Sequence, residues 1–198
     1  MNSSYRLLAP ALNPVLAADL ELADFEPTSF DDYEDLRFEL KALGNFETKK
    51  CRFLDVAFRA QQATEWLAGE SNFRNVTLEI GRVGSFDLTA TKLNVVTFEN
   101  IRAGYVNLIN SSIQDILFKD CRFDTLDLFA TKAKRIRFEN CKVEDLDVRE
   151  MQGEHIDLRG LDFNHVRGIA SLRGATINED QLMHLASDLA LLAGINVA

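Results

Sequence analysis

The sequence is short of residues that could stabilise it by cross-linking, because it contains only three cysteines among 198 residues. Three thiols do not make a disulfide framework. The chain also has only three prolines and one tryptophan, and no apolar run approaches the length of a membrane span. Acidic residues outnumber basic ones by 31 to 22, which argues against direct binding to nucleic acid. We therefore expect a cytoplasmic protein without a membrane segment.

Motifs for catalysis are also missing. His155, His165 and His184 each lie apart from any partner at a metal-ligand spacing, and we expect them to be solvated. The sequence contains no Gly-rich phosphate loop, no nucleophile elbow and no HExxH helix. It therefore predicts a protein that is not an enzyme and that has no cofactor or metal site.

What the chain does contain is an apolar residue at nearly every fifth position from Tyr33 to Phe163. Of these 27 positions 25 are apolar, whereas an apolar content of 46% would give about 12 by chance. The two exceptions are Thr48 and Gly153. A period of five fits neither a helix nor a flat strand, because successive members would wander around the helix or alternate between strand faces. The chain must therefore bend once in every five residues.

A second inward set lies two positions earlier, so each five-residue unit points two side chains inward and four units make one square coil. The resulting twenty-residue repeat can be read in aligned segments that begin at Phe98, Phe118, Phe138 and Leu158. One turn of the coil receives residues that tolerate unusual dihedrals, namely Asn100, Asp120, Asn140 and Gly160. Three inward positions hold cysteine, and we expect buried free thiols rather than a disulfide at Cys51, Cys121 and Cys141.

These units resemble pentapeptide repeats, in which Asp or Asn precedes a central Leu or Phe. The pattern is clearest in Phe86-Asp87-Leu88, Val106-Asn107-Leu108, Leu126-Asp127-Leu128 and Leu146-Asp147-Val148. The resemblance covers about residues 30 to 175 and is to the actinobacterial type, more distantly to the mycobacterial and Qnr quinolone-resistance proteins. It implies an all-β solenoid, a right-handed quadrilateral β-helix of about six to seven coils. We expect three parts, a cap at 1–30, the β-helix at 31–175 and a C-terminal helix and tail at 176–198.

A helix at about 179 to 192 is predicted to cap the C-terminal end. Asn178 and Gln181 have the spacing of a capping box, and Gly194 follows the last apolar residue. The helix carries more apolar surface than one rod end can bury, so it is either a plain cap or a cap that pairs with a second copy. The family resemblance implies the homodimer. The candidate interface is Leu182, Met183, Leu185, Ala186, Leu189, Ala190 and Leu192.

The N-terminal region is less regular. Its apolar residues, broken by Pro10 and Pro14, make a poor signal peptide and are expected to cover the other end of the rod. Residues 17–40 hold nine acidic residues against one base, Arg37, whereas residues 76–175 hold 15 acidic and 14 basic residues. The acidic stretch is either a solvated surface or the place that attracts a basic partner. Candidate partner-binding residues there are Asp31, Asp32, Glu34 and Asp35.

The register falters around residues 61–70, which suggests a bulge or a loop leaving the rod. Trp66 and Leu67 are therefore either buried packing residues or an exposed anchor for a partner.

Two non-enzymatic functions remain. The first is a scaffold that binds another protein whose identity is unknown. The second, implied by the resemblance, is a modulator of DNA gyrase or topoisomerase IV that resembles DNA in width and charge. The nearly neutral coil body speaks against the second function.

Overall fold

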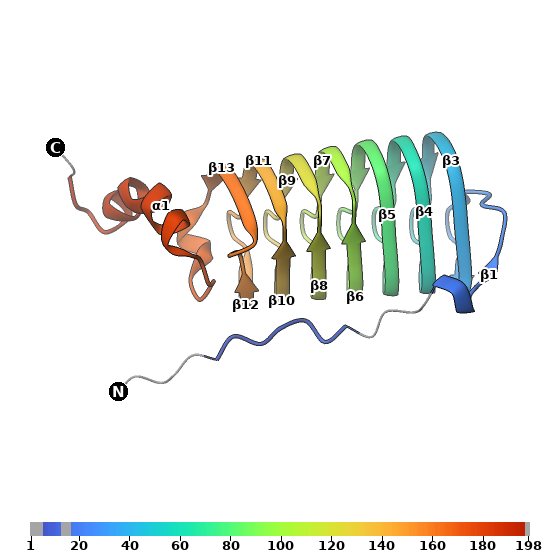
Figure 1. Cartoon of the computed structure of the whole chain (residues 1–198), viewed down its shortest axis with the longest axis horizontal. Helices are drawn as coiled ribbons and strands as arrows, with labels where there is room; N and C mark the ends of the chain where they lie inside the picture. Colours follow the sequence, from blue (N-terminus) through green and yellow to red (C-terminus); the bar gives the residue numbers. More distant parts are fainter. Residues whose placement is uncertain (1–5, 13–16, 197–198) are drawn as a thin grey trace.

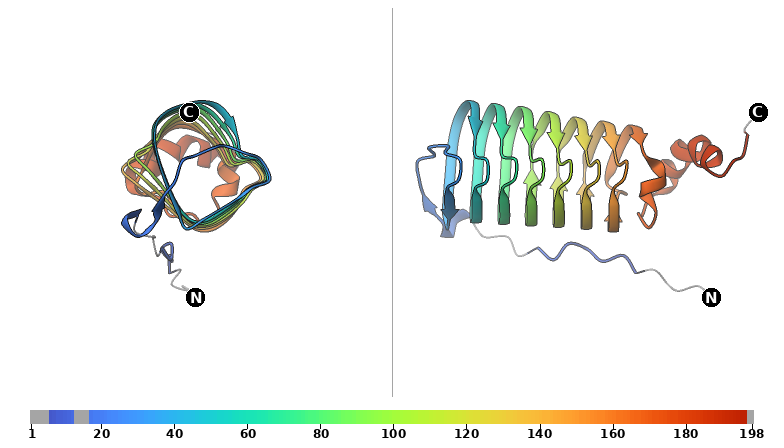
Figure 2. Two further views of the ribbon diagram at one scale, coloured as in Figure 1. Left: turned by 90° about the vertical axis from the view of Figure 1, so that its right-hand side faces the viewer. Right: turned by 180° about the vertical axis from the view of Figure 1, so that it is seen from behind.

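The chain forms a right-handed β-solenoid in a computed structural model that describes residues 6–12 and 17–196 (Figure 1). About seven coils stack along one axis, since the pairing register advances by twenty residues through roughly 140 residues. The view along the axis shows the coils superposed in a four-sided outline (Figure 2). The predicted fold class is confirmed.

The strands are short where the coil turns sharply and long where two sides run on without a break. The first two cover Glu21–Leu22 (β1) and Asp32–Glu34 (β2). Three long strands follow, β3 (Leu36–Glu47), β4 (Arg52–Leu67) and β5 (Asn72–Asp87). The rest are β6 (Lys92–Glu99), β7 (Arg102–Asn107), β8 (Ser112–Lys119), β9 (Arg122–Asp127), β10 (Lys132–Glu139), β11 (Cys141–Asp147), β12 (Gln152–Asp157) and β13 (Leu161–Arg167).

Every strand pair from β2 onward is parallel and is offset by twenty residues, as the pairs Arg52 with Asn72 and Arg102 with Arg122 show. Identical columns therefore stack directly in the core. The rings of Phe98, Phe118 and Phe138 lie nearly parallel, with centroids 4.7 and 4.8 Å apart. This spacing equals the distance between neighbouring strands, so one phenylalanine per coil continues the ladder without a gap.

The corners of the coil use left-handed backbone at residues that are not glycine. Asn100, Asp120 and Asn140 have φ of 54°, 53° and 50°, as expected from their residue types. A second corner repeats the same conformation at Asp35, Asp55, Asn75, Val95, Asp115, Arg135 and His155. The chain therefore turns through the same left-handed backbone conformation at more than one corner of each coil, without inserted loops.

The N-terminal region departs from its predicted place. Residues 6–12 run along the side of the solenoid and do not cover its end (Figure 1). The Leu8 N–H donates to His155 Nδ1 at 3.3 Å, and the Ala11 N–H donates to Asp115 Oδ1 at 2.8 Å. His155 and Asp115 are two coils apart, about 10 Å, which three residues of extended chain can span. Val15 and Leu16 lie outside the described residues.

The N-terminal end of the core is covered instead by Phe25, which is buried and belongs to the core, whereas Leu20 is buried outside it. The Phe25 ring lies 4.9 Å from Phe38 and 5.0 Å from Phe58, between centroids. A short 3-10 helix, η1 (Ala17–Asp19), precedes this cover. An aromatic residue therefore packs over the end of the core that the N-terminal apolar residues were expected to cover.

The C-terminal end is closed by a 3-10 helix, η2 (Ile169–Leu172), and by α1 (Glu179–Leu192). The bounds of α1 match the prediction, and both hydrogen bonds of the Asn178–Gln181 capping box are present. The Gln181 amide also donates to the carbonyls of Leu158 and Leu161, at 2.7 and 2.6 Å. One side chain thus caps the helix and satisfies carbonyls of the last coil.

Candidate functional site

Trp66 lies in the core and has no exposed surface. Its ring stacks on Phe86 at 4.6 Å, and its Nε1 donates to Thr48 Oγ1 at 2.7 Å. The expected bulge or loop at 61–70 is absent, because β4 runs unbroken to Leu67 and pairs in register with β3 and β5, and the turn after it repeats in the neighbouring coils. Trp66 therefore has no surface for a partner, and Leu67 beside it is half-buried.

Thr48 explains why the fifth-residue register fails once. This buried threonine accepts the indole hydrogen bond that a buried tryptophan needs. The polar residue at position 48 and the tryptophan at position 66 are therefore explained together, by one hydrogen bond between stacked coils.

The acidic candidates of the first coil are all exposed, at Asp31, Asp32, Glu34 and Asp35. Arg52 of the next coil pairs with Asp32 at 2.9 Å and with Glu34 at 3.7 Å. These ion pairs are open to solvent and contribute little to stability. The carboxylates thus remain available at the N-terminal end of the solenoid.

The candidate interface residues of α1 divide into two groups. Leu185 is buried against its own chain, and Leu189 and Ala190 are half-buried. The remaining four are exposed, namely Leu182, Met183, Ala186 and Leu192. Leu191 and Ile195 add exposed apolar surface that the candidate interface did not include.

An apolar hollow of about 590 Å³ lies between η2 and α1. Leu172, Leu185, Leu189 and Leu192 line it together with Ile169, Ala170, Arg173, Ala175 and Ile177. In both side views α1 extends past the last coil, away from the body of the solenoid (Figures 1 and 2). The C-terminal end therefore combines a hollow with exposed apolar side chains on one helix, which is a typical arrangement for protein contact.

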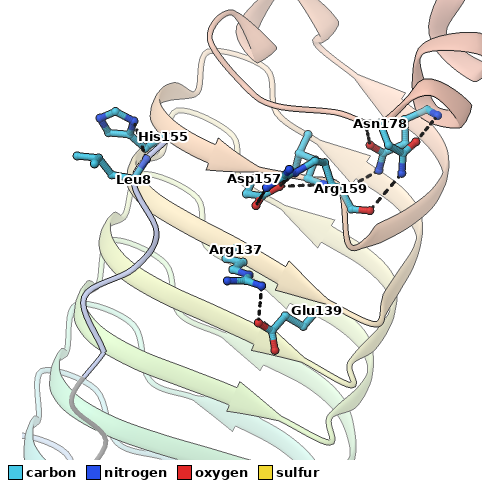
Figure 3. Close-up of polar contacts among 9 residues, drawn as sticks. Leu8, Arg137, Glu139, His155, Asp157, Arg159 and Asn178 are labelled. Carbon is cyan, nitrogen blue, oxygen red and sulfur yellow. Dashed lines mark hydrogen bonds and ion pairs between the residues drawn. The ribbon is translucent and has the colours of Figure 1, made fainter. Parts of the chain in front are cut away.

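The sides of the solenoid present paired charges of both signs. Lys119 contacts Glu99 at 2.6 Å, and Arg59 contacts Glu79 at 2.7 Å, each across one coil. Arg137 pairs with Glu139 on the same strand (Figure 3). Opposite charges thus pair at these positions, whereas Arg82, Arg102 and Arg122 form an exposed basic column.

The Asp/Asn column of the repeat has a structural role. The side chains of Asp87, Asn107, Asp127 and Asp147 each accept a hydrogen bond from the backbone N–H two residues later, at 2.9 to 3.0 Å. Asp157 repeats the contact and is bound by Arg159, which lowers the pKa of its carboxyl (Figure 3). These side chains hold the turns of the coil.

Asp115 is a buried carboxylate that sequence reasoning missed. Arg135 contacts it through two hydrogen bonds of 2.6 Å, and the Ala11 N–H supplies a third. Burial alone would raise the pKa of Asp115, but these donors outweigh it and lower the pKa below its usual value. Its φ of 56° marks it as a turn residue, and only the folded chain shows that residues 6–12 lie over it.

His155 is not solvated as predicted, because its ring accepts the Leu8 N–H (Figure 3). His184 lies on α1 with Nε2 2.9 Å from the Asn164 carbonyl oxygen, and the side chain of His165 is exposed. The described ranges contain no group of three or more residues placed to hold a metal ion. No helix in these ranges has the length and apolar character needed to cross a membrane.

No family model and no curated protein matches the sequence. Two solved structures of trypsin-treated QnrB1 variants, a plasmid-mediated fluoroquinolone resistance protein, are similar in outline. The first has 16% identity and a TM-score of 0.36, and covers 89% of this chain and 96% of its own. The second has 17% identity and a TM-score of 0.32, and covers 89% of this chain and 94% of its own. Likeness at this level does not extend to partners or activity.

Proposed function

We propose that the protein is a non-catalytic scaffold of the pentapeptide-repeat type, which binds other proteins at the ends of its solenoid and joins a second copy through α1. The observation that carries this proposal is the apolar C-terminal end. Leu192, which lines the hollow between η2 and α1, is 59% exposed, and Met183 elsewhere on α1 is 75% exposed. Burying such side chains against a symmetry mate stabilises a dimer by about 1.5 kcal/mol or more for each.

The dimer would be symmetric, because one end surface pairs with its own copy. The opposite end is negatively charged and would face outward on both copies. Two rods joined in this way present two identical binding ends, far apart and rigidly oriented.

The paired substitution Leu182→Glu and Met183→Glu tests the proposal. Both side chains are exposed, so the variant keeps its fold while charge repels the second copy. Light scattering should report two chains for the unchanged protein and one for the variant. Leu22→Glu, at a site 56% exposed on the other end, is the matched control and should remain a dimer. A single-chain mass for the unchanged protein contradicts the proposal.

The buried free thiols of Cys51, Cys121 and Cys141 favour a reducing compartment. We therefore propose that the scaffold works in the cytoplasm.

Modulation of DNA gyrase or topoisomerase IV is the alternative function. The rod shape and the acidic N-terminal end favour it, while the paired charges along the sides oppose it. A supercoiling assay with purified gyrase separates the two functions. Inhibition, or protection from a quinolone, supports the alternative, and neither effect at micromolar protein supports the scaffold alone.

A further inference from the structure

The outer edge of β3, at the N-terminal end, is left largely unpaired by the fold. Within the described part of the chain, β1 is the strand that pairs with this edge, and it reaches only Leu36 and Arg37. The other edge of β3 pairs with β4 along Arg37 to Glu47. Residues 38–47 therefore have a neighbouring strand on one side alone, and an open edge of this kind accepts a further strand.

The carbonyl of Glu47 illustrates the unused pairing. In the next coils the carbonyls of Leu67, Asp87 and Asn107 each accept an N–H from the coil before, at 2.8 Å. The donor to Leu67 is Thr48. Twenty residues before it stands Thr28, whose N–H donates to the Tyr33 hydroxyl at 3.2 Å instead. The N–H of Thr28, which by the repeat would donate to the Glu47 carbonyl, is therefore bonded to Tyr33 instead.

Gly44 gives a second observation of the same kind. A Cβ at Gly84 or Gly104, in the same column, would lie 2.6 or 2.8 Å from a carbonyl oxygen of the preceding coil. A Cβ at Gly44 would meet nothing within 4 Å. Thr64 in this column shows that a side chain is tolerated there. Gly44 therefore makes the approach of another backbone easier, but glycine is not required at this position.

The charge of this end selects the partner. Residues 17–40 carry nine acids against Arg37, and the exposed carboxylates include Glu21, Asp24, Glu26 and Asp35. Besides Arg37, the same coil carries Lys41, Lys49 and Lys50. Lys49 pairs with Glu47 at 3.3 Å, and Lys50 pairs with Glu70 at 3.6 Å. A second copy would bring an equal negative charge to the edge, which opposes pairing between two N-terminal ends.

We propose that the outer edge of β3 binds an extended, lysine- or arginine-rich segment of another protein, which adds a strand beside residues 38–47. Backbone hydrogen bonds would supply affinity, and the surrounding carboxylates would supply preference for basic residues. This inference rests on the scaffold function and specifies its partner, but it does not depend on the dimer at the other end.

Amide hydrogen exchange of the full chain with a synthetic peptide of alternating lysine and valine tests the inference. Amides of residues 38–47 should exchange more slowly when the peptide binds, and binding should weaken as salt rises. A matched peptide of alternating glutamate and valine should not bind. The lysine peptide with every second backbone N methylated should bind at least about tenfold more weakly, since it cannot form one row of hydrogen bonds.

Variants of the protein test the charge. Replacing Asp24, Glu26 and Asp35 by their amides should weaken peptide binding about tenfold, while the control Asp162→Asn at the other end should leave it unchanged. Equal binding of the methylated peptide, protection outside residues 38–47, or no binding at millimolar peptide overturns the inference. Light scattering on the same samples reports the dimer separately, so failure here and failure of the dimer are distinguishable.

Discussion

At the scale of the residue, the hydrogen bond between Trp66 and Thr48 shows why a solenoid core is not made of apolar side chains alone. The indole of Trp66 is fully buried, and its N–H needs an acceptor in the core. Thr48 supplies that acceptor from the coil before. The fifth-residue pattern of apolar residues shows Thr48 only as an exception and does not predict its hydrogen bond.

The substitution Thr48→Val should destabilise the protein by about 1 to 3 kcal/mol, because the Trp66 N–H then stays buried without an acceptor. The double variant Thr48→Val, Trp66→Phe removes both polar groups and should cost less than the sum of the two single changes. Urea unfolding measures the three free energies. Strict additivity would mean that the 2.7 Å contact contributes nothing.

Tyr105 is expected to titrate late. Burial, the negative charge of Asp127 and the hydrogen bond to it at 3.1 Å raise the pKa of Tyr105 from 10.0 to about 12. The folded state favours the neutral phenol, so this contribution to stability is present below pH 10 and is lost as the pH rises through about 12. Burial also raises the pKa of Tyr33, so ultraviolet titration is compared between the unchanged protein and Asp127→Asn, in which the pKa of Tyr105 should fall and that of Tyr33 should not change. A Tyr105 that titrates near 10 in the unchanged protein contradicts this assignment.

At the scale of the element, the sequence predicts the coils and the C-terminal helix but not the path of the N-terminal segment. The bounds of α1 follow from the capping box and the apolar stripe, both of which are local signals. The twenty-residue register follows from side-chain periodicity. The path of residues 6–12 could not be predicted, because it depends on backbone N–H groups that meet Asp115 and His155 far along the chain.

Gln181 joins α1 to the last coil, and its loss should loosen the cap. Gln181→Leu leaves the carbonyls of Leu158 and Leu161 without their donor, which should cost about 1 to 3 kcal/mol for each unsatisfied group. Thermal unfolding should show a lower midpoint, and amides of α1 should exchange faster. Ser187→Ala, on the exposed face of α1, is the control and should change little. An unchanged midpoint in Gln181→Leu would show that the amide is dispensable.

At the scale of the whole molecule, regular stacking makes the sides uniform and leaves the distinctive chemistry at the ends. The N-terminal end carries an open strand edge among carboxylates, and the C-terminal end carries an apolar hollow and an exposed helix. Sequence periodicity predicted the uniform part. The surfaces that differ lie where the repeat stops, so periodicity says little about which of their residues stay exposed.

Small-angle scattering combined with light scattering tests the end-to-end scaffold most directly. The unchanged protein should have the mass of two chains and about twice the maximum dimension of the Leu182→Glu, Met183→Glu variant, whose coils alone stack to about 30 to 35 Å. A doubled mass without the added length would mean that the rods associate side by side, and this result, like a single-chain mass, would contradict the account.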